Sequence, residues 1–227
     1  MMKITNFDIN CLEVVGEYKL FTFVNPFSYY VLQRECVDSH FEIFADGILM
    51  VKLHNMFSDH KIKRFSFDFT SLANEVLNHC SKNSFKVALV GGSETEISLA
   101  QKVISRRFPK LDTFAHHGYF RGREAELRES LKQYQPDVII CGMGTPLQEK
   151  FLLEFSPNLP SLKFGFTCGG FLSQISANEN YFHPFFDKLH LRWLQRFFRH
   201  GYVRRRLLCD YPVFTIRYIL EKVSKKL

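Results

Sequence analysis

Short apolar runs and amphipathic segments alternate along the first third of the chain. Residues 19–24, KLFTFV, form an apolar run that Asn25-Pro26 ends, which predicts a buried strand followed by a helix over about residues 28–35. A second short strand is predicted before the corner Asp46-Gly47, and the apolar residues beyond that corner fit either a helix or a strand. A polar loop then leads into a helix whose N-cap candidates are Thr70 and Ser71.

The clearest unit of the pattern spans residues 86–120. Residues 86–92, KVALVGG, read as a buried strand ended by glycines, and residues 93–108 read as an amphipathic helix. Ser93 and Glu96 stand three residues apart at the start of this helix, which is the spacing of a capping box. The following segment, PKLDTFAHHGYF, returns to a strand and its loop, so the unit predicts a strand, a helix and a parallel strand.

The alternation continues to about residue 174. A helix near residues 124–134 precedes a buried strand at Asp137–Cys141, and an amphipathic helix follows it. The segment KFGFTCGGFLSQ adds a strand that Gly169-Gly170 ends. This order predicts an α/β fold, a Rossmann-like parallel sheet with helices on both faces.

The C-terminal part differs in character, and we expect residues 1–185 to form the core and residues 186–227 a helical appendage. Its segment RWLQRFFRHGYVRRRLL places arginines on one stripe of a helix, with Trp and Phe side chains beside and opposite it. That arrangement is typical of a helix in a membrane interface, and an amphipathic helix docked on its own domain is the alternative. Charge alone would also suit nucleic acid, but no reader motif accompanies it, so we expect no nucleic-acid partner.

Composition places the protein among intracellular globular chains. The chain has 227 residues and a formal net charge of +7, much of it in the appendage. Its six cysteines form neither a C-x-x-C pair nor a zinc-like cluster with histidine, so we expect buried free thiols in a reducing compartment. Neither a secretory signal nor a membrane-spanning run is visible. We therefore expect a cytoplasmic protein, either soluble or peripheral on a membrane.

Four positions could carry chemistry, and each has a structural alternative. Gly91-Gly92 stands between a strand and a capped helix, where it could approach a phosphate or simply make a tight turn. Asp46 is either a turn residue or a general base. Arg64 is either a solvated surface side chain or a fork for phosphate or carboxylate. Gln148 opens a helix, where its amide could orient a hydroxyl, whereas Glu149 beside it reads as a first-turn stabiliser.

Taken together, these features resemble one family. The chain is similar to the WecG/TagA/CpsF glycosyltransferases of teichoic acid, enterobacterial common antigen and capsule or O-antigen synthesis. The resemblance runs from about residue 19 to 215 in the ordered motifs Asn25-Pro26, Ala45-Asp46-Gly47, Arg64 with Asp68, LVGGSETEISLAQKVISRRFPKL with Gly118-Tyr119-Phe120, PDVIICGMGTPLQE, GFTCGGFLS and LRWLQRFFR.

The resemblance implies an activity and its partners. It implies inverting transfer of a sugar, N-acetylmannosamine or another hexose, from a UDP-sugar to a saccharide linked to undecaprenyl diphosphate. It also implies a peripheral enzyme on the inner face of the cytoplasmic membrane that needs no bound metal or other cofactor. Association of the chain with itself stays open.

The resemblance also implies roles for individual residues. Asp46 matches the proposed catalytic base, and Arg64 matches an arginine that would offset the charge of the leaving diphosphate. The remaining residues expected to bind substrate are Asn25, Thr22, Gly91, Gly92, Tyr119, Gly142, Gln148, Arg196, Arg204 and Arg206.

This chain departs from the family pattern at several positions. Phe23 stands where the family often has Thr, although Thr22 is adjacent, and YFHP replaces an expected Arg-Ala-Pro before the appendage. These changes bear on the identity of the sugar donor and acceptor. A Rossmann-type nucleotide- or dinucleotide-binding protein, an oxidoreductase or a sensor, is the alternative that the fold alone allows.

Overall fold

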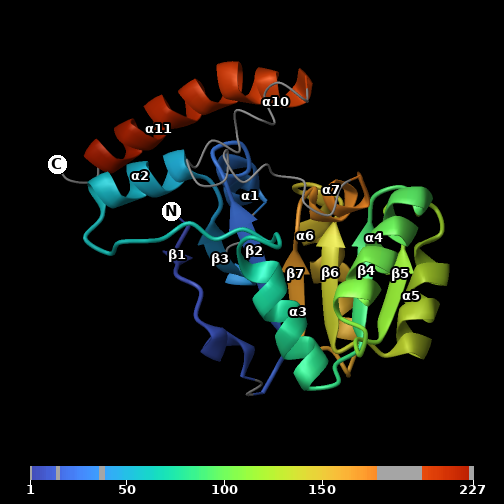
Figure 1. The fold of residues 1–227 in the computed structure, drawn as a ribbon. Helices are drawn as coiled ribbons and strands as arrows, with labels where there is room; N and C mark the ends of the chain where they lie inside the picture. Colours follow the sequence, from blue (N-terminus) through green and yellow to red (C-terminus); the bar gives the residue numbers. More distant parts are fainter. Residues whose placement is uncertain (1, 14–15, 36–38, 178–200, 225–227) are drawn as a thin grey trace.

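A seven-stranded, all-parallel sheet with helices on both faces organises the computed structural model, which describes residues 2–13, 16–35, 39–177 and 201–224 (Figure 1). The strands run in the order β1-β3-β2-β7-β6-β4-β5. Their bounds are β1 Ile4–Thr5, β2 Lys19–Val24, β3 Glu42–Ala45, β4 Val87–Gly91, β5 Thr113–His116, β6 Val138–Gly142 and β7 Phe164–Thr167. The predicted α/β fold is confirmed.

Helices follow most of the strands. Their bounds are α1 Tyr29–Arg34, α2 Ile48–Phe57, α3 Leu72–Lys82, α4 Glu94–Arg107, α5 Glu124–Tyr134, α6 Leu147–Phe155, α7 Phe171–Ala177, α10 Gly201–Arg205 and α11 Tyr211–Val223. Short 3-10 turns occupy Ile9–Leu12 and Ser156–Asn158, and a π-helical turn occupies Arg206–Asp210. The apolar segment after Asp46-Gly47 is therefore a helix, which settles the alternative that the pattern left open.

The sheet is buried on both sides because its strands alternate between two apolar layers. Ala88 and Val90 of β4 pack in one layer with α1, α2, α5 and α6, whereas Val87 and Leu89 pack in the other with α3, α4 and α7. Successive strand side chains point to opposite faces, so a strand covered on both faces reads as a continuous apolar run.

Two predicted helix starts behave differently. The capping box of α4 is confirmed, since Ser93 N–H donates to Glu96 Oε2 at 2.7 Å and Glu96 N–H donates to Ser93 Oγ at 3.3 Å. Ser71 occupies the N-cap position of α3, but its hydroxyl oxygen accepts from the backbone N–H of Ser66 at 3.3 Å instead of capping the helix. The Ser71 side chain thus stabilises the polar loop before α3 instead of the helix start.

The C-terminal helix α11 lies over α1 and α2 in Figure 1. Phe214 and Tyr218 are each 1% exposed, and both rings lie 5.7 Å from the ring of Tyr29 in α1. The boundary that we expect near residue 185 lies outside the described residues. The described end of the chain shares the apolar layer of the core.

The cysteine prediction holds only in part. Cys80, Cys141 and Cys168 are buried free thiols, but Cys11 is half-buried and Cys209 is exposed on the C-terminal segment. Cys209 is exposed because its position on the π-helical turn faces away from the cavity that Leu207 of the same turn lines.

The strand order creates a crevice at the carboxyl edge of the sheet. The neighbouring strands β2 and β7 are followed by α1 and α7, which pack on opposite faces. The chain therefore leaves two adjacent strands in opposite directions, and open α/β sheets bind their ligands at such a point.

Candidate active site

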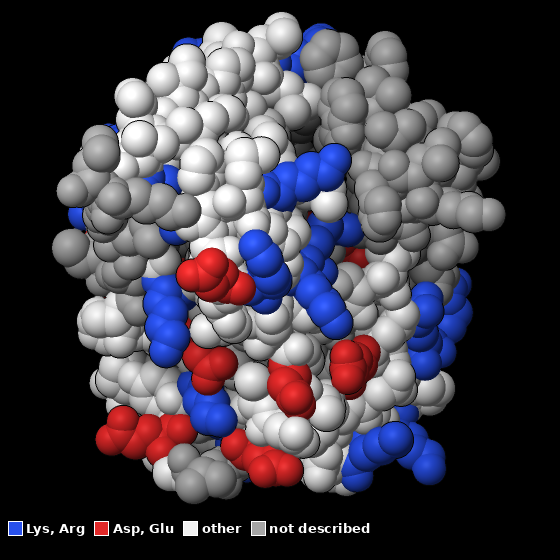
Figure 2. Space-filling model, turned by 90° about the vertical axis from the view of Figure 1, so that its left-hand side faces the viewer, with Lys and Arg blue, Asp and Glu red and all other residues white. Residues whose placement is uncertain are grey.

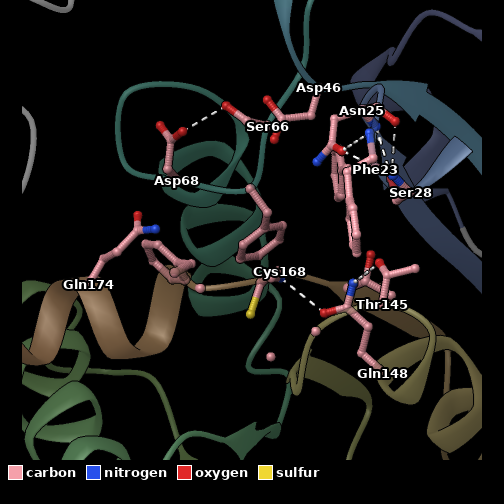
Figure 3. A pocket seen from close by; sticks show the side chains of 18 of the residues that line it. Phe23, Asn25, Ser28, Asp46, Ser66, Asp68, Thr145, Gln148, Cys168 and Gln174 are labelled. Atoms are coloured by element: carbon pink, nitrogen blue, oxygen red, sulfur yellow. Dashed lines mark hydrogen bonds between the residues drawn. The ribbon is translucent and has the colours of Figure 1, made fainter. Parts of the chain in front are cut away.

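A cavity of about 980 Å³ occupies this crevice. The loops that follow β2, β3, β4, β5, β6 and β7 all contribute to its lining, and Leu207 and Tyr211 add side chains from the C-terminal segment. Figure 3 shows Asp46, Ser66 and Asp68 on one side of it and Gln148 with Thr145 on another. Residues far apart in the sequence meet here because the strands are parallel.

Asp46 is presented at the carboxyl end of β3. Its N–H donates to the carbonyl oxygen of Val24 at 2.7 Å, and Gly47 follows with a φ of +116°, a conformation that side-chain-bearing residues rarely adopt. Glycine is therefore required for the sharp exit that leaves the Asp46 side chain at the cavity. Its side chain remains 32% exposed.

Arg64 reaches the same point from a separate segment that pairs with the end of β3. Phe65 N–H donates to the carbonyl oxygen of Ala45 at 2.8 Å, which fixes this segment against the strand. Arg64 Nε lies 3.5 Å from Asp46 Oδ1, and Nη2 donates to Ser66 Oγ at 2.9 Å. Asp46 and Arg64, eighteen residues apart in sequence, thus form one charged pair at the cavity wall.

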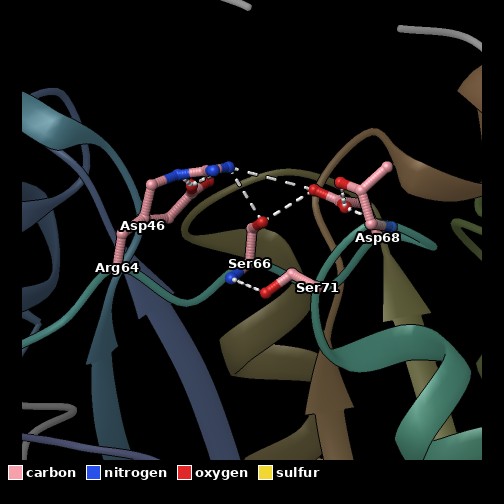
Figure 4. A network of polar contacts seen from close by, with 6 residues as sticks. Asp46, Arg64, Ser66, Asp68 and Ser71 are labelled. Atoms are coloured by element: carbon pink, nitrogen blue, oxygen red, sulfur yellow. Dashed lines mark hydrogen bonds and ion pairs between the residues drawn. The ribbon is translucent and has the colours of Figure 1, made fainter. Parts of the chain in front are cut away.

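A second carboxylate completes this polar network (Figure 4). Ser66 Oγ donates to Asp68 Oδ2 at 2.7 Å, and Arg64 Nη2 lies 3.9 Å from the same oxygen. Asp68 Oδ1 also accepts from the N–H of Thr70 at 2.9 Å. The guanidinium is held between Asp46 and Asp68, so its fork has a defined direction before any ligand arrives.

Asn25 closes the loop after β2. Its Oδ1 accepts from the N–H groups of Phe27 and Ser28, at 3.0 and 3.1 Å, as α1 begins. The amide nitrogen side of Asn25 is turned toward the cavity in Figure 3. One end of the amide therefore builds the local turn, and the other end faces the space where a ligand would lie.

Gln148 bridges two loops of the cavity wall. Its Oε1 accepts from the N–H of Gly169 at 3.1 Å, and its Nε2 donates to Glu149 Oε1 at 3.0 Å. Gln148 is only 3% exposed, so it holds the loop after β6 against the loop after β7. Its amide is engaged on both sides by the protein.

Glu149 lies beneath this wall and is fully buried. Its Oε1 accepts from Thr22 Oγ1 at 2.8 Å, from Gln148 and from Thr145 Oγ1 at 3.3 Å, whereas its Oε2 has no hydrogen-bond partner among the described residues. Burial raises the pKa of the Glu149 carboxyl, which these hydrogen bonds oppose. Thr167 donates to Thr22 at 3.0 Å and extends the network to β7.

The start of α4 is already occupied by a carboxylate of the protein. Hydrogen bonds from the backbone and side chain of Ser93 lower the pKa of Glu96. Because the charged Glu96 group accepts the amide there, this helix start favours hydroxyl or amide donors of a ligand over a second anion. Gly91 has a packing reason for being glycine, since a Cβ there would meet the carbonyl oxygen of Gly142 at 2.4 Å.

A cysteine nucleophile is not favoured by the geometry. Cys168 lines the cavity, but burial raises the pKa of its thiol, and the same cause raises the pKa of Cys141 well above its ordinary value. Both sulfurs therefore remain protonated and inert. Among the described residues that line the cavity, the charged groups are the carboxylates of Asp46, Asp68 and Glu96 and the guanidinium of Arg64.

Comparison with known proteins identifies the family. The model of the Glycosyl transferase WecG/TagA/CpsF family matches residues 12–227. The chain belongs to this family. This glycosyltransferase is 38% identical over 208 residues to a UDP-Gal:alpha-D-GlcNAc-diphosphoundecaprenol beta-1,4-galactosyltransferase of Shigella boydii, covering 90% of this chain and 87% of the relative.

A second kind of relative comes from Staphylococcus aureus. An N-acetylglucosaminyldiphosphoundecaprenol N-acetyl-beta-D-mannosaminyltransferase of strain MW2 is 26% identical over 196 residues, covering 85% of this chain and 74% of the relative. Membership of the family replaces the oxidoreductase and sensor alternative with a glycosyltransferase.

The glycosyltransferase gathers most of the expected site residues into one cavity. The expected residues that line it are Asn25, Asp46, Arg64, Gly92, Tyr119, Gly142 and Gln148. Thr22 and Gly91 are buried beneath the wall and do not line it, and Arg204 is exposed outside it. Arg196 and the side chain of Arg206 lie outside the described part of the chain.

Sequence reasoning missed three contributors to this glycosyltransferase site. Glu149 lies in the first turn of α6 as local rules predict, but its burial beneath the cavity wall against Thr22 arises only from the fold. Leu207 and Tyr211 line the cavity from a segment whose pattern indicated only charge and helix. No local signal pointed to their contact with the core.

Residues 2–13, 16–35, 39–177 and 201–224 contain no group of three or more His, Cys, Asp or Glu that could hold a metal ion. In the same ranges, no helix has both the length and the apolar character that crossing a bilayer requires.

Proposed function

We propose that this glycosyltransferase moves a hexose from UDP to a hydroxyl of a saccharide carried on undecaprenyl diphosphate, in the synthesis of a cell-surface polysaccharide. The Asp46–Arg64 pair at the cavity carries the proposal, because it supplies a base and a cation within 3.5 Å of each other. The names of the two relatives support the donor and acceptor classes, and UDP-galactose is the first donor to test.

In the proposed reaction the acceptor hydroxyl gives its proton to Asp46 while its oxygen attacks the anomeric carbon of the donor. The bond from that carbon to UDP breaks on the opposite face, so one displacement converts an α-linked donor into a β-linked product. Both relatives are named for β-linked transfer. Arg64 faces the negative charge that grows on the departing diphosphate.

The donor nucleoside belongs at the other end of the cavity. Tyr119 is 78% exposed on the rim and offers a ring face to a uracil base, and Gln174 of α7 offers an amide donor and acceptor. The Glu96 carboxylate near this end suits ribose hydroxyls and repels phosphate. This orientation places the diphosphate and the sugar toward Arg64 and Asp46.

A lipid-linked acceptor requires the enzyme to work at the inner face of the cytoplasmic membrane. The outer face of α11 is apolar at Val213, Ile216, Leu220 and Val223, while Phe214 and Tyr218 on its inner face are buried. We call these four residues the outer stripe. In Figure 2 acidic side chains gather in the lower part of the visible face, and the upper part, where α11 lies, is mainly uncharged. An apolar helix face at the surface supports peripheral membrane association, and the neighbouring Glu221 carboxylate is paired with Arg217 Nε at 3.1 Å.

Ligand binding provides the direct test of this function. Thermal unfolding is measured with UDP, UDP-sugars, GDP, ADP and NAD, each with and without EDTA. Ligand at a hundred times its dissociation constant stabilises the native state by about 2.7 kcal/mol. The proposal requires a shift with UDP compounds that EDTA leaves unchanged. A shift with NAD and none with UDP would contradict it.

A further inference from the structure

An apolar groove opens from the cavity between the first turn of α2 and the start of α11. It has a volume of about 430 Å³ and is lined by Leu49, Leu207, Tyr211, Pro212, Thr215 and Ile216. The first three of these residues also line the cavity, so the groove and the cavity adjoin at these side chains. The groove therefore begins at the wall of the site and leads along α11.

The chemistry of the described lining favours an apolar occupant over a sugar or a phosphate. None of the described residues that line it is charged. The hydroxyl of Thr215 donates to the carbonyl oxygen of Tyr211 at 2.8 Å, so this polar atom is satisfied within the helix. Among the described lining residues, Thr215 and Tyr211 alone carry a polar side-chain atom and the rest are apolar, so the groove suits hydrocarbon.

The position of the groove matches the order of groups in a lipid-linked saccharide. Leu49 stands three residues after Asp46, so the groove begins close to the carboxylate. At its other end Ile216 is 62% exposed and belongs to the outer stripe. A ligand whose hydroxyl lies at Asp46 can enter the groove with its hydrocarbon and continue toward a membrane surface.

We propose that this groove binds the isoprene units next to the diphosphate of the acceptor, and so selects a polyprenyl carrier. The inference rests on the proposed function and adds a binding site for the lipid to it. Burying an isoprenoid chain removes apolar surface from water, so affinity for the acceptor rises with chain length until the groove is filled.

Two matched substitutions on α11 test the groove. Ile216→Glu places a carboxylate in the groove, whereas Leu220→Glu places one a turn later on the same exposed stripe, outside the groove. The two side chains are 62% and 64% exposed, so both variants are expected to keep the native melting temperature. Transfer is measured without bilayer or micelles, so that the outer stripe does not contribute through membrane binding.

The acceptors carry one saccharide diphosphate on either a farnesyl or a methyl group. Wild-type enzyme is expected to show a lower KM for the farnesyl acceptor. Ile216→Glu is expected to raise that KM about tenfold and to leave kcat/KM for the methyl acceptor unchanged, while Leu220→Glu changes neither. Equal KM values of the wild-type enzyme for both acceptors would overturn the proposal that the groove binds isoprene units. Equal KM values of the two variants for the farnesyl acceptor would overturn it as well.

Failure of the proposed function has a different signature. If wild-type enzyme transfers sugar to no acceptor, the function fails, and the groove is then judged by the binding of farnesyl diphosphate alone. Ile216→Glu is expected to weaken that binding about tenfold, and Leu220→Glu is expected to leave it unchanged. Equal affinity of the wild-type protein and both variants for farnesyl diphosphate would contradict the proposal that the groove binds the lipid.

Discussion

Arg64 is the residue through which the parts of the polar network meet. Its guanidinium contacts Asp46, Ser66 and Asp68 from a segment that also pairs with the end of β3. A guanidinium held between two carboxylates has a fixed direction. A leaving diphosphate then finds a cation already in place, which lowers the reorganisation that the reaction demands.

Two substitutions of Arg64 distinguish the effect of its positive charge from the effect of its forked guanidinium. Arg64→Ala is expected to lower kcat about a hundredfold or more, because removal of one preorganised donor typically has an effect of that size. Arg64→Lys should recover part of the loss, since it restores charge without the fork. Steady-state kinetics with the exposed neighbour Lys63→Ala as control provide the measurement. Full activity of Arg64→Ala would contradict the proposed role of Arg64 in stabilising the leaving diphosphate.

Glu149 predicts a pH-dependent stability. Burial raises the pKa of Glu149 above 4.5, so the unfolded chain releases this proton at lower pH than the folded one. Glu149 therefore contributes less stability as pH rises above 4.5, and Glu149→Gln, which does not titrate, removes that loss.

Denaturant unfolding at several pH values measures the effect. The stability of Glu149→Gln relative to wild type should increase as pH rises from 4.5 through the raised pKa. A relative stability that stays constant over this range would show that the carboxyl titrates equally in both states.

The position of an individual residue was predictable from sequence only where its immediate neighbours in the chain determine its conformation. Asp46 follows a strand and precedes a glycine with positive φ, which the sequence shows as an Asp-Gly corner. Glu149 is a first-turn residue by local rules, and only the fold brings Thr22 within 2.8 Å of it across 127 residues. Local sequence carries no information about such a pair.

At the scale of elements, the strands and helices of the core followed the apolar pattern closely. The run at residues 19–24 became β2 with the same bounds, and the Ser93–Glu96 capping box starts α4. The helix α11 was harder to predict because it has apolar residues on two sides. Phe214 and Tyr218 face the core, whereas the outer stripe faces away from it.

The inner side of α11 should carry most of its docking energy. Phe214→Ala is expected to lower the free energy of unfolding by about 3–5 kcal/mol, because the buried ring packs against Tyr29. Ile216→Ala, on the exposed side, should change it by less than about 0.5 kcal/mol. Chemical denaturation compares the two. Similar losses in both variants would contradict the assignment of inner and outer sides.

At the scale of the whole molecule, the cavity, the groove and the outer stripe follow one another from the sheet to the surface of α11. Sequence patterns predicted that residues 186–227 associate with the membrane, chiefly through an arginine and Trp/Phe helix at residues 192–199, which lies outside the described residues. The outer stripe escaped notice because its i, i+3, i+7 spacing overlaps that of the buried side of the same helix.

Vesicle binding tests the outer stripe. The double variant Val213→Glu, Leu220→Glu is expected to cosediment less with vesicles that contain anionic lipid, because it removes apolar area and adds negative charge. A variant with Leu99→Glu, an exposed leucine of α4, serves as control. Undiminished binding of the double variant would leave another surface, or a second copy of the chain, as the partner.

Sugar transfer by wild-type enzyme and Asp46→Asn tests the central claim most directly. The assay follows labelled sugar from UDP-galactose, and then from other UDP-hexoses, to GlcNAc-diphosphoundecaprenol, with Asp59→Asn as an exposed control. We predict transfer by the wild type and the control, and a rate about 10²–10⁴-fold lower in Asp46→Asn with UDP binding retained. Wild-type-like transfer by Asp46→Asn, or none by the wild type from any UDP-hexose, would contradict the account.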